Sequence, residues 1–139
     1  MIGVPTTLFR VAGGLLVVVV GVAVGFGGFT LWRATPSTWP DLVATTSTTK
    51  GVASGMLILA VLLLVAGGAA VMNRRWGRWL AAIAILAFVA GGFWVNYILF
   101  GDIRPAHSGA NAILAIAILL MLRAGQTSTP DTFHPDRKS

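Results

Sequence analysis

Cysteine is absent from this chain of 139 residues, and acidic side chains are scarce. Without cysteine, the chain cannot form disulfides, thiolate metal sites, thiol redox pairs or an acylated lipoprotein anchor. The four acids all lie outside the long apolar runs: Asp41, Asp102, Asp131 and Asp136. Ionisable groups within a membrane usually mark proton relays and coupled transport. The sequence therefore predicts neither thiol chemistry nor ion-coupled transport.

Charge of either sign is also sparse. Charged residues make up 10% of the chain, hydrophobic residues make up 56%, and the mean hydropathy is +0.85. A soluble domain carries about 25% charged residues, and a domain this small keeps a large surface that no core can hide. The missing water-facing surface indicates that lipid surrounds most of the protein.

The net charge of +6 does not indicate a nucleic-acid partner. The ten Lys and Arg residues are scattered, and they form no basic stripe with interleaved aromatic residues that could follow a phosphate backbone. The preference for Arg over Lys, together with abundant Ala, Gly and Val, is typical of bacterial sequences of high GC content. We therefore predict a protein of the bacterial cell (inner) membrane.

Four apolar runs have the length of membrane-spanning helices. They cover Leu8 to Trp32, Val52 to Met72, Trp79 to Phe100 and Ala106 to Leu122. A helix needs about 20 residues to cross the hydrocarbon core, with a range of roughly 17 to 25. The runs lack the two-residue alternation of a membrane barrel, so helices are expected. The first run has no small-residue cleavage site, which favours a retained span over a signal peptide.

Positive charges predict the orientation of these spans. Seven Lys and Arg residues lie on one side: Arg10, Arg74, Arg75, Arg78, Arg123, Arg137 and Lys138. Three lie on the other side: Arg33, Lys50 and Arg104. The positive-inside rule then places both termini in the cytoplasm. The fold class expected is an all-α bundle of four transmembrane helices over residues 1–123, followed by a disordered cytoplasmic tail over residues 124–139.

The largest outer loop, between the first two spans, carries a helix-start signal. Thr38 precedes Pro40 and has Asp41 three positions on, which predicts a short helix capped by Thr38. Trp39, Leu42 and Val43 would place this helix on the bilayer interface. The following TTSTTKG is expected to be a polar linker.

Small residues mark candidate packing surfaces, because lipid tails give helices little hydrophobic reason to associate. In the first span Gly14, Gly21 and Gly28 recur every seven residues, and Gly21 and Gly25 form a GxxxG pair. In the third span Ala84, Ala87 and Gly91 form a similar row. Packing within the four-helix bundle explains such rows. The alternative is that one row, on the glycine-rich first helix, docks onto another protein.

Polar residues gather in GDIRPAHSGAN, between the last two spans. Pro105 suits the first turn of the fourth helix. His107 and Asn111 are four residues apart and share a face, and Asn96 lies near the outer end of the third span. The residues of a possible outer polar pocket are Asn96, Asp102, Arg104, His107 and Asn111. A capped hairpin whose polar groups meet water explains the same residues.

The segment NRRWGRW joins the second and third spans on the side expected to be cytoplasmic. Arginines attract anionic headgroups, and tryptophans prefer the membrane interface. We expect lipid-headgroup contact from Arg74, Arg75, Trp76, Arg78 and Trp79. A docking surface for a cytoplasmic partner is the alternative.

Residues 55–100 resemble the middle of small four-span actinobacterial membrane proteins that are loosely DoxX-like. The elements that carry the resemblance are Gly67 and Gly68, the turn from Arg75 to Arg78, and the Asn96-Tyr97 pair. The resemblance implies a four-helix membrane protein. The thiol redox chemistry linked to some DoxX-like proteins is not carried over, because the chain has no cysteine.

No residue pattern predicts a catalytic nucleophile, a metal site or a cofactor. The leading hypothesis is a non-catalytic accessory or scaffolding subunit of a larger bacterial membrane complex, with membrane lipids and a larger membrane protein or further copies of itself as partners. One alternative is a minimal channel or carrier for a small neutral solute, lined by Asn96, His107 and Asn111. Another is a lipid- or quinone-binding anchor that uses Trp76, Trp79 and the arginines beside them.

Overall fold

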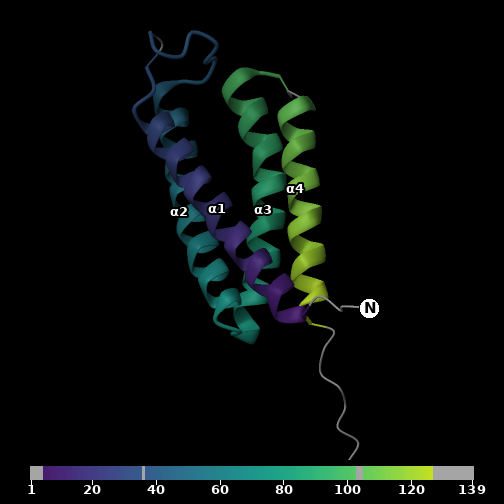
Figure 1. Cartoon of the computed structure of the whole chain (residues 1–139). Coiled ribbons are helices and arrows are strands. Elements are labelled where there is room, and N and C mark those ends of the chain that lie inside the picture. Colours follow the sequence, from purple (N-terminus) through teal and green to yellow (C-terminus); the bar gives the residue numbers. More distant parts are fainter. Residues whose placement is uncertain (1–4, 36, 103–104, 127–139) are drawn as a thin grey trace, which may run out of the picture.

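The computed structural model of the chain describes residues 5–35, 37–102 and 105–126. Within them lie four helices: α1 (Thr6–Trp32), α2 (Thr46–Val71), α3 (Arg75–Phe100) and α4 (Pro105–Ala124). Successive helices run in opposite directions and form one elongated bundle (Figure 1). All four are long and apolar enough to cross a membrane. This confirms the predicted all-α, four-helix membrane fold.

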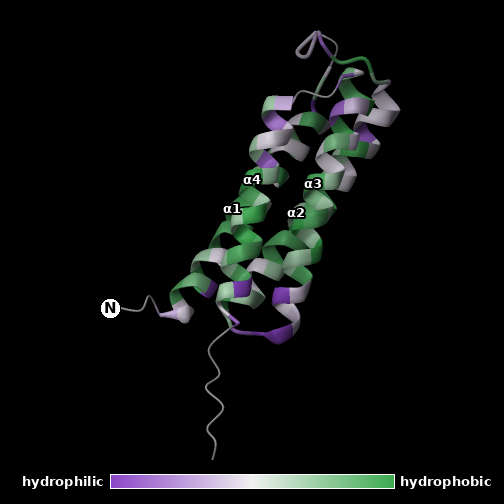
Figure 2. Cartoon of the chain, turned by 90° about the vertical axis from the view of Figure 1, so that its right-hand side faces the viewer, coloured by the Kyte–Doolittle hydropathy of each residue, from purple (hydrophilic) through white to green (hydrophobic). Residues whose placement is uncertain are grey.

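The two ends of the bundle differ in chemistry. The arginine-rich end holds the start of α1, the α2–α3 turn and the end of α4, with five described arginines: Arg10, Arg74, Arg75, Arg78 and Arg123. The loop end holds the long α1–α2 loop and the connection from α3 to α4. Between the two ends the helices are predominantly hydrophobic (Figure 2). The cytoplasmic location of the arginine-rich end stays a prediction, and most of the expected disordered tail, residues 127–139, lies outside the described residues.

The α1–α2 pair is the most closely packed in the bundle. A Cβ atom placed on Gly14, Gly21 or Gly28 would lie 3.0 to 3.2 Å from a carbonyl oxygen of α2. A Cβ on Gly25 would lie 3.3 Å from that of Ala60 on the same helix. The heptad spacing of these glycines therefore lets two backbones approach closely, and the row is used inside the bundle.

Buried side chains from all four helices form the main core. The largest fully buried ones there are Val17, Leu63, Ile85 and Ile118. Only part of the row of small residues expected on α3 is buried in the core. Ala84 is buried, but Ala87 is exposed and Gly91 is half-buried, because the buried face of α3 continues from Ala84 through Ile85 to Phe88.

The helix α2 begins six residues before the expected span. The side chain of Thr45 accepts a hydrogen bond from the Thr48 N–H at 3.3 Å, so Thr45 is the N-cap. Thr49 is buried, and its hydroxyl donates to the Thr45 carbonyl at 2.9 Å. The segment predicted to be a polar linker is therefore largely helical.

The prediction of a short helix starting at Thr38 is wrong. The Thr38 hydroxyl instead closes a turn with Thr35, by accepting from its N–H and donating to its carbonyl. The loop then folds over the end of α3. There Trp39 stacks on Phe100 with ring centroids 6.3 Å apart, and the Val43 N–H donates to the Leu99 carbonyl at 2.9 Å. Of the apolar loop residues expected at the bilayer interface, only Val43 is exposed.

The turn from α2 to α3 is short, and a left-handed residue closes it. Asn73 has φ 61°, the Arg74 N–H donates to the Ala69 carbonyl, and the Asn73 N–H donates to the Ala70 carbonyl. The helix α3 then begins at Arg75, and Gly77 packs directly onto Ala69. The expected loop NRRWGRW is thus mostly the first turns of α3.

Candidate functional site

The structure describes four of the five polar residues expected to form a pocket at the loop end. Asp102 and His107 are exposed, and Asn96 and Asn111 are half-buried. Arg104, the fifth residue of the expected pocket, lies outside the described residues. The prediction that Pro105 opens the last helix is confirmed.

Asn96 and Asn111 both lie near Gly92, but their side chains do not hydrogen-bond to each other. The Asn96 side-chain N–H donates to the Gly92 carbonyl of its own helix at 3.0 Å. A Cβ placed on Gly92 would lie 3.9 Å from the Asn111 Nδ2 atom. The structure therefore brings the two amides to the same region and satisfies the first of them within α3.

The buried polar side chain of this segment is Ser108, which the sequence did not single out. It is 5% exposed, and its hydroxyl has no hydrogen-bond partner. A hydroxyl usually marks a water-facing position, so only the packing of α4 against its neighbours shows that this one is enclosed.

Replacing Ser108 with alanine is expected to raise the free energy of unfolding by up to about 1 kcal/mol, because it removes a buried hydroxyl that has no partner. Ser54→Ala is the control, since the Ser54 hydroxyl donates to the Lys50 carbonyl at 2.9 Å, and this variant should show no gain. Chemical unfolding in detergent micelles measures both. If Ser108→Ala loses more stability than Ser54→Ala, the conclusion that the Ser108 hydroxyl has no hydrogen-bond partner is contradicted.

At the arginine-rich end, the structure places the expected headgroup-contacting residues in and beside the first turns of α3. Arg74, Arg75, Trp76 and Trp79 are exposed, and Arg78 is half-buried with an enclosed Nε atom that has no partner. Their contact with lipid headgroups stays a prediction.

Within the described ranges 5–35, 37–102 and 105–126, no three His, Cys, Asp or Glu side chains come together in a group that could hold a metal ion. One hollow is lined by apolar side chains, a second by arginine with apolar side chains, and a third by loop residues that include Thr38 and Asp41.

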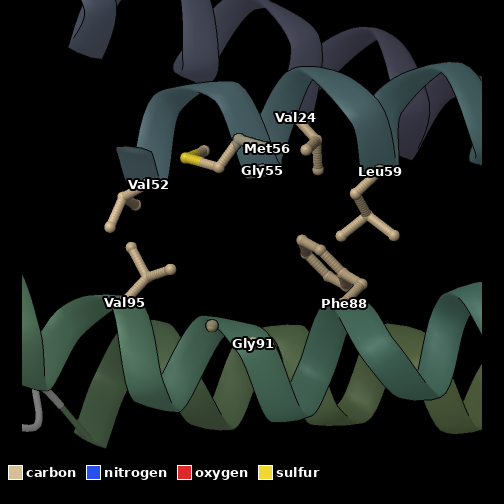
Figure 3. A pocket seen from close by; sticks show the side chains of 9 residues that line it. Val24, Val52, Gly55, Met56, Leu59, Phe88, Gly91 and Val95 are labelled. Atoms are coloured by element: carbon tan, nitrogen blue, oxygen red, sulfur yellow. The ribbon is translucent and has the colours of Figure 1, made fainter. Parts of the chain in front are cut away.

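An apolar cavity of about 270 Å³ lies between α2 and α3 (Figure 3). Val52, Gly55, Met56 and Leu59 of α2 face Phe88, Gly91, Gly92 and Val95 of α3, and Val24 of α1 completes the lining. These side chains offer no hydrogen-bonding group, so the hollow is suited to a hydrocarbon surface rather than a polar solute.

Small residues without neighbours border this cavity. A Cβ placed on Gly55 or Gly91 would meet no atom within 4 Å, and the same holds for Gly51, one turn before Gly55. Gly51 and Gly55 therefore form a GxxxG pair on an exposed part of α2. This pair was not predicted from the sequence, because the second span was expected to begin at Val52. The cap at Thr45 was the signal that would have extended the helix over Gly51.

Comparisons with protein-family models, with curated proteins and with solved structures found no match to this chain. The resemblance to small DoxX-like membrane proteins therefore stays a prediction.

Proposed function

We propose that this integral membrane protein is a non-catalytic accessory subunit of a larger bacterial membrane complex. We further propose that it binds a transmembrane helix of its partner at the α2–α3 face. This face is defined by Gly51 and Gly55 on α2, by Gly91 on α3 and by the apolar cavity beside them. The observation that carries the proposal is the exposed GxxxG pair beside an apolar hollow.

The location of the free glycines supports this face over the first helix. In a membrane, small residues promote association because they let helix backbones come close. Those of α1 are already covered by α2 or, at Gly13, by α4, whereas Gly51, Gly55 and Gly91 have open space in front of them. Large apolar side chains elsewhere on the surface face lipid and carry no such information.

The lining of the cavity favours a helix over a transported solute. A carrier for a neutral solute needs hydrogen-bonding groups along its path, and the α2–α3 hollow has none. Of the polar residues expected to line such a path, His107 is exposed and the Asn96 amide is hydrogen-bonded to its own helix.

The test is to recover the tagged protein from its native membrane with Gly55 replaced by leucine. The leucine would fill the cavity, so the yield of a stoichiometric partner should fall about tenfold or more, corresponding to at least about 1.4 kcal/mol of lost binding free energy. Gly109→Leu on α4 is the matched control, because a Cβ at Gly109 also meets nothing within 4 Å. Neither variant should disturb the fold.

The control should retain its partner within about twofold of the unmodified protein. Equal recovery of the partner in both variants would contradict docking at the α2–α3 face. If the unmodified protein is recovered without any partner, the accessory role itself is contradicted.

A further inference from the structure

A second hollow lies at the arginine-rich end, between α3 and α4. Its volume is about 200 Å³, and its polar lining comes from Arg78 and Arg123, together with Gln126 just after α4. Trp79 stands beside Arg78, and the other side is apolar, with Ala82 and Leu119 among the lining residues. The hollow therefore joins a doubly cationic side to an apolar one.

No acidic side chain of the described residues neutralises this charge. The only described acids, Asp41 and Asp102, lie at the opposite, loop end of the bundle. The Arg78 Nε atom is enclosed and has no hydrogen-bond partner. Arg10 of α1 packs against Gly125 through its Cβ and backbone atoms, and its Nε atom is also enclosed without a partner. Enclosed cationic donors are costly unless an anion reaches them.

We infer that this hollow binds the phosphodiester headgroup of one anionic phospholipid, whose acyl chains lie along the apolar surfaces of α3 and α4. The inference is independent of the accessory-subunit proposal. Arginine presents planar, forked donors that match phosphate oxygens. Basic pockets between transmembrane helices on the cytoplasmic side bind acidic lipid headgroups, and this is the side where the positive-inside rule places the arginine-rich end.

The size of the hollow and its apolar side favour a lipid over a soluble anion. Pockets for whole small molecules begin at roughly 300 Å³, so this one holds only part of a ligand. Ala82 and Leu119 lie deeper in the bundle than Arg78 and Arg123 along their helices. A ligand held there thus has its anionic group at the membrane surface and its hydrocarbon in the membrane.

The test uses the full-length protein in nanodiscs of phosphatidylcholine with phosphatidylglycerol. Native mass spectrometry counts the phosphatidylglycerol molecules that the protein retains after release from the disc. The double variant Arg78→Gln with Arg123→Gln is compared with Arg74→Gln with Arg75→Gln. Both variants lose two positive charges at the same end, but only the first pair lines the hollow.

We expect the unmodified protein to retain one phosphatidylglycerol. Its apparent affinity should fall at least about tenfold in Arg78→Gln with Arg123→Gln, and by clearly less in Arg74→Gln with Arg75→Gln, whose expected headgroup contacts lie outside the hollow. An equal loss in both variants would show diffuse surface attraction and overturn the inference. Retention of phosphatidylcholine as strong as that of phosphatidylglycerol would also overturn it. Displacement of the lipid by glycerol phosphate at equal concentration would point to a soluble phosphate and overturn the lipid assignment.

The acids of the tail, Asp131 and Asp136, are tested in the same experiment. The variant Asp131→Asn with Asp136→Asn should retain phosphatidylglycerol as the unmodified protein does. If the unmodified protein retains no phosphatidylglycerol and this tail variant does, the tail carboxylates pair with the arginines in place of a lipid. The inference is then overturned.

Discussion

Replacing Gly67 with leucine is expected to abolish the folded bundle. A Cβ at this position would lie 2.8 Å from the Gly14 carbonyl oxygen and 3.0 Å from the Val18 backbone nitrogen. Backbone atoms cannot move aside as a flexible side chain can, so α1 and α2 must separate. Overpacking by a few atoms costs about 1–3 kcal/mol, and leucine adds more, against a total stability of about 5–15 kcal/mol. Thermal unfolding followed by circular dichroism in mild detergent measures the effect.

The adjacent residue provides a matched control. A Cβ at Gly68 would meet nothing within 4 Å, and leucine favours a helix over glycine by about 0.8 kcal/mol. Gly68→Leu should therefore unfold at the same temperature as the unmodified protein or at a higher one. If Gly67→Leu and Gly68→Leu have the same midpoint, the close approach of α1 and α2 is contradicted.

Gly77→Ala should be the most damaging single added methyl group on α3. The new Cβ would lie 2.5 Å from the Ala69 Cβ and 2.7 Å from the Ala69 carbonyl carbon. The turn from Met72 to Arg74 is fixed by three backbone hydrogen bonds, so it cannot shift without losing them. We expect a loss of about 1–3 kcal/mol in the free energy of unfolding, measured by denaturant titration in micelles.

Two further variants separate this clash from the general effect of alanine. Gly91→Ala lies on the same helix and meets nothing within 4 Å, so it should be neutral or stabilising. Ala69→Gly combined with Gly77→Ala removes the contact between the two Cβ atoms but not the contact with the backbone. It should recover only part of the loss, after correction for Ala69→Gly alone. Complete recovery would show that the side chain of Ala69 alone sets the spacing.

The number of helices and their membrane character followed from the sequence, because long apolar runs have few other structures open to them in lipid. The first residues of the helices could not be predicted, because hydropathy locates the apolar part of a helix and not its N-cap. Thr45 caps α2 within a polar stretch, and α3 begins among the arginines at Arg75. The Thr38 pattern misled because the same hydroxyl can close a local turn with Thr35.

The glycine pattern could be predicted in part. The heptad spacing in α1 correctly indicated a packing surface, but spacing alone cannot say which helix covers it. Only the arrangement in space shows that α2 covers Gly14, Gly21 and Gly28, while Gly51 and Gly55 stay open. A test that replaces Gly21 or Gly25 would therefore confuse loss of folding with loss of a partner. Gly55 is the better position, because its substitution alters an open surface.

The hollow at the arginine-rich end could not be predicted as a unit. Arg78 and Arg123 are 45 positions apart in the sequence, and their proximity depends on the antiparallel arrangement of α3 and α4. The charge at this end was evident from counting. The enclosure of the Arg78 Nε atom was not, because it requires the neighbouring helix.

The most direct test of the proposed role is photo-cross-linking in the native membrane, with a photoreactive residue placed at Gly55 in one protein and at Gly109 in another. Both positions are exposed and meet no atom within 4 Å. We predict a single adduct with a larger membrane protein from position 55 and none from position 109. Adducts with lipid alone from position 55, or the same protein adduct from both positions, would contradict a partner helix at the α2–α3 face.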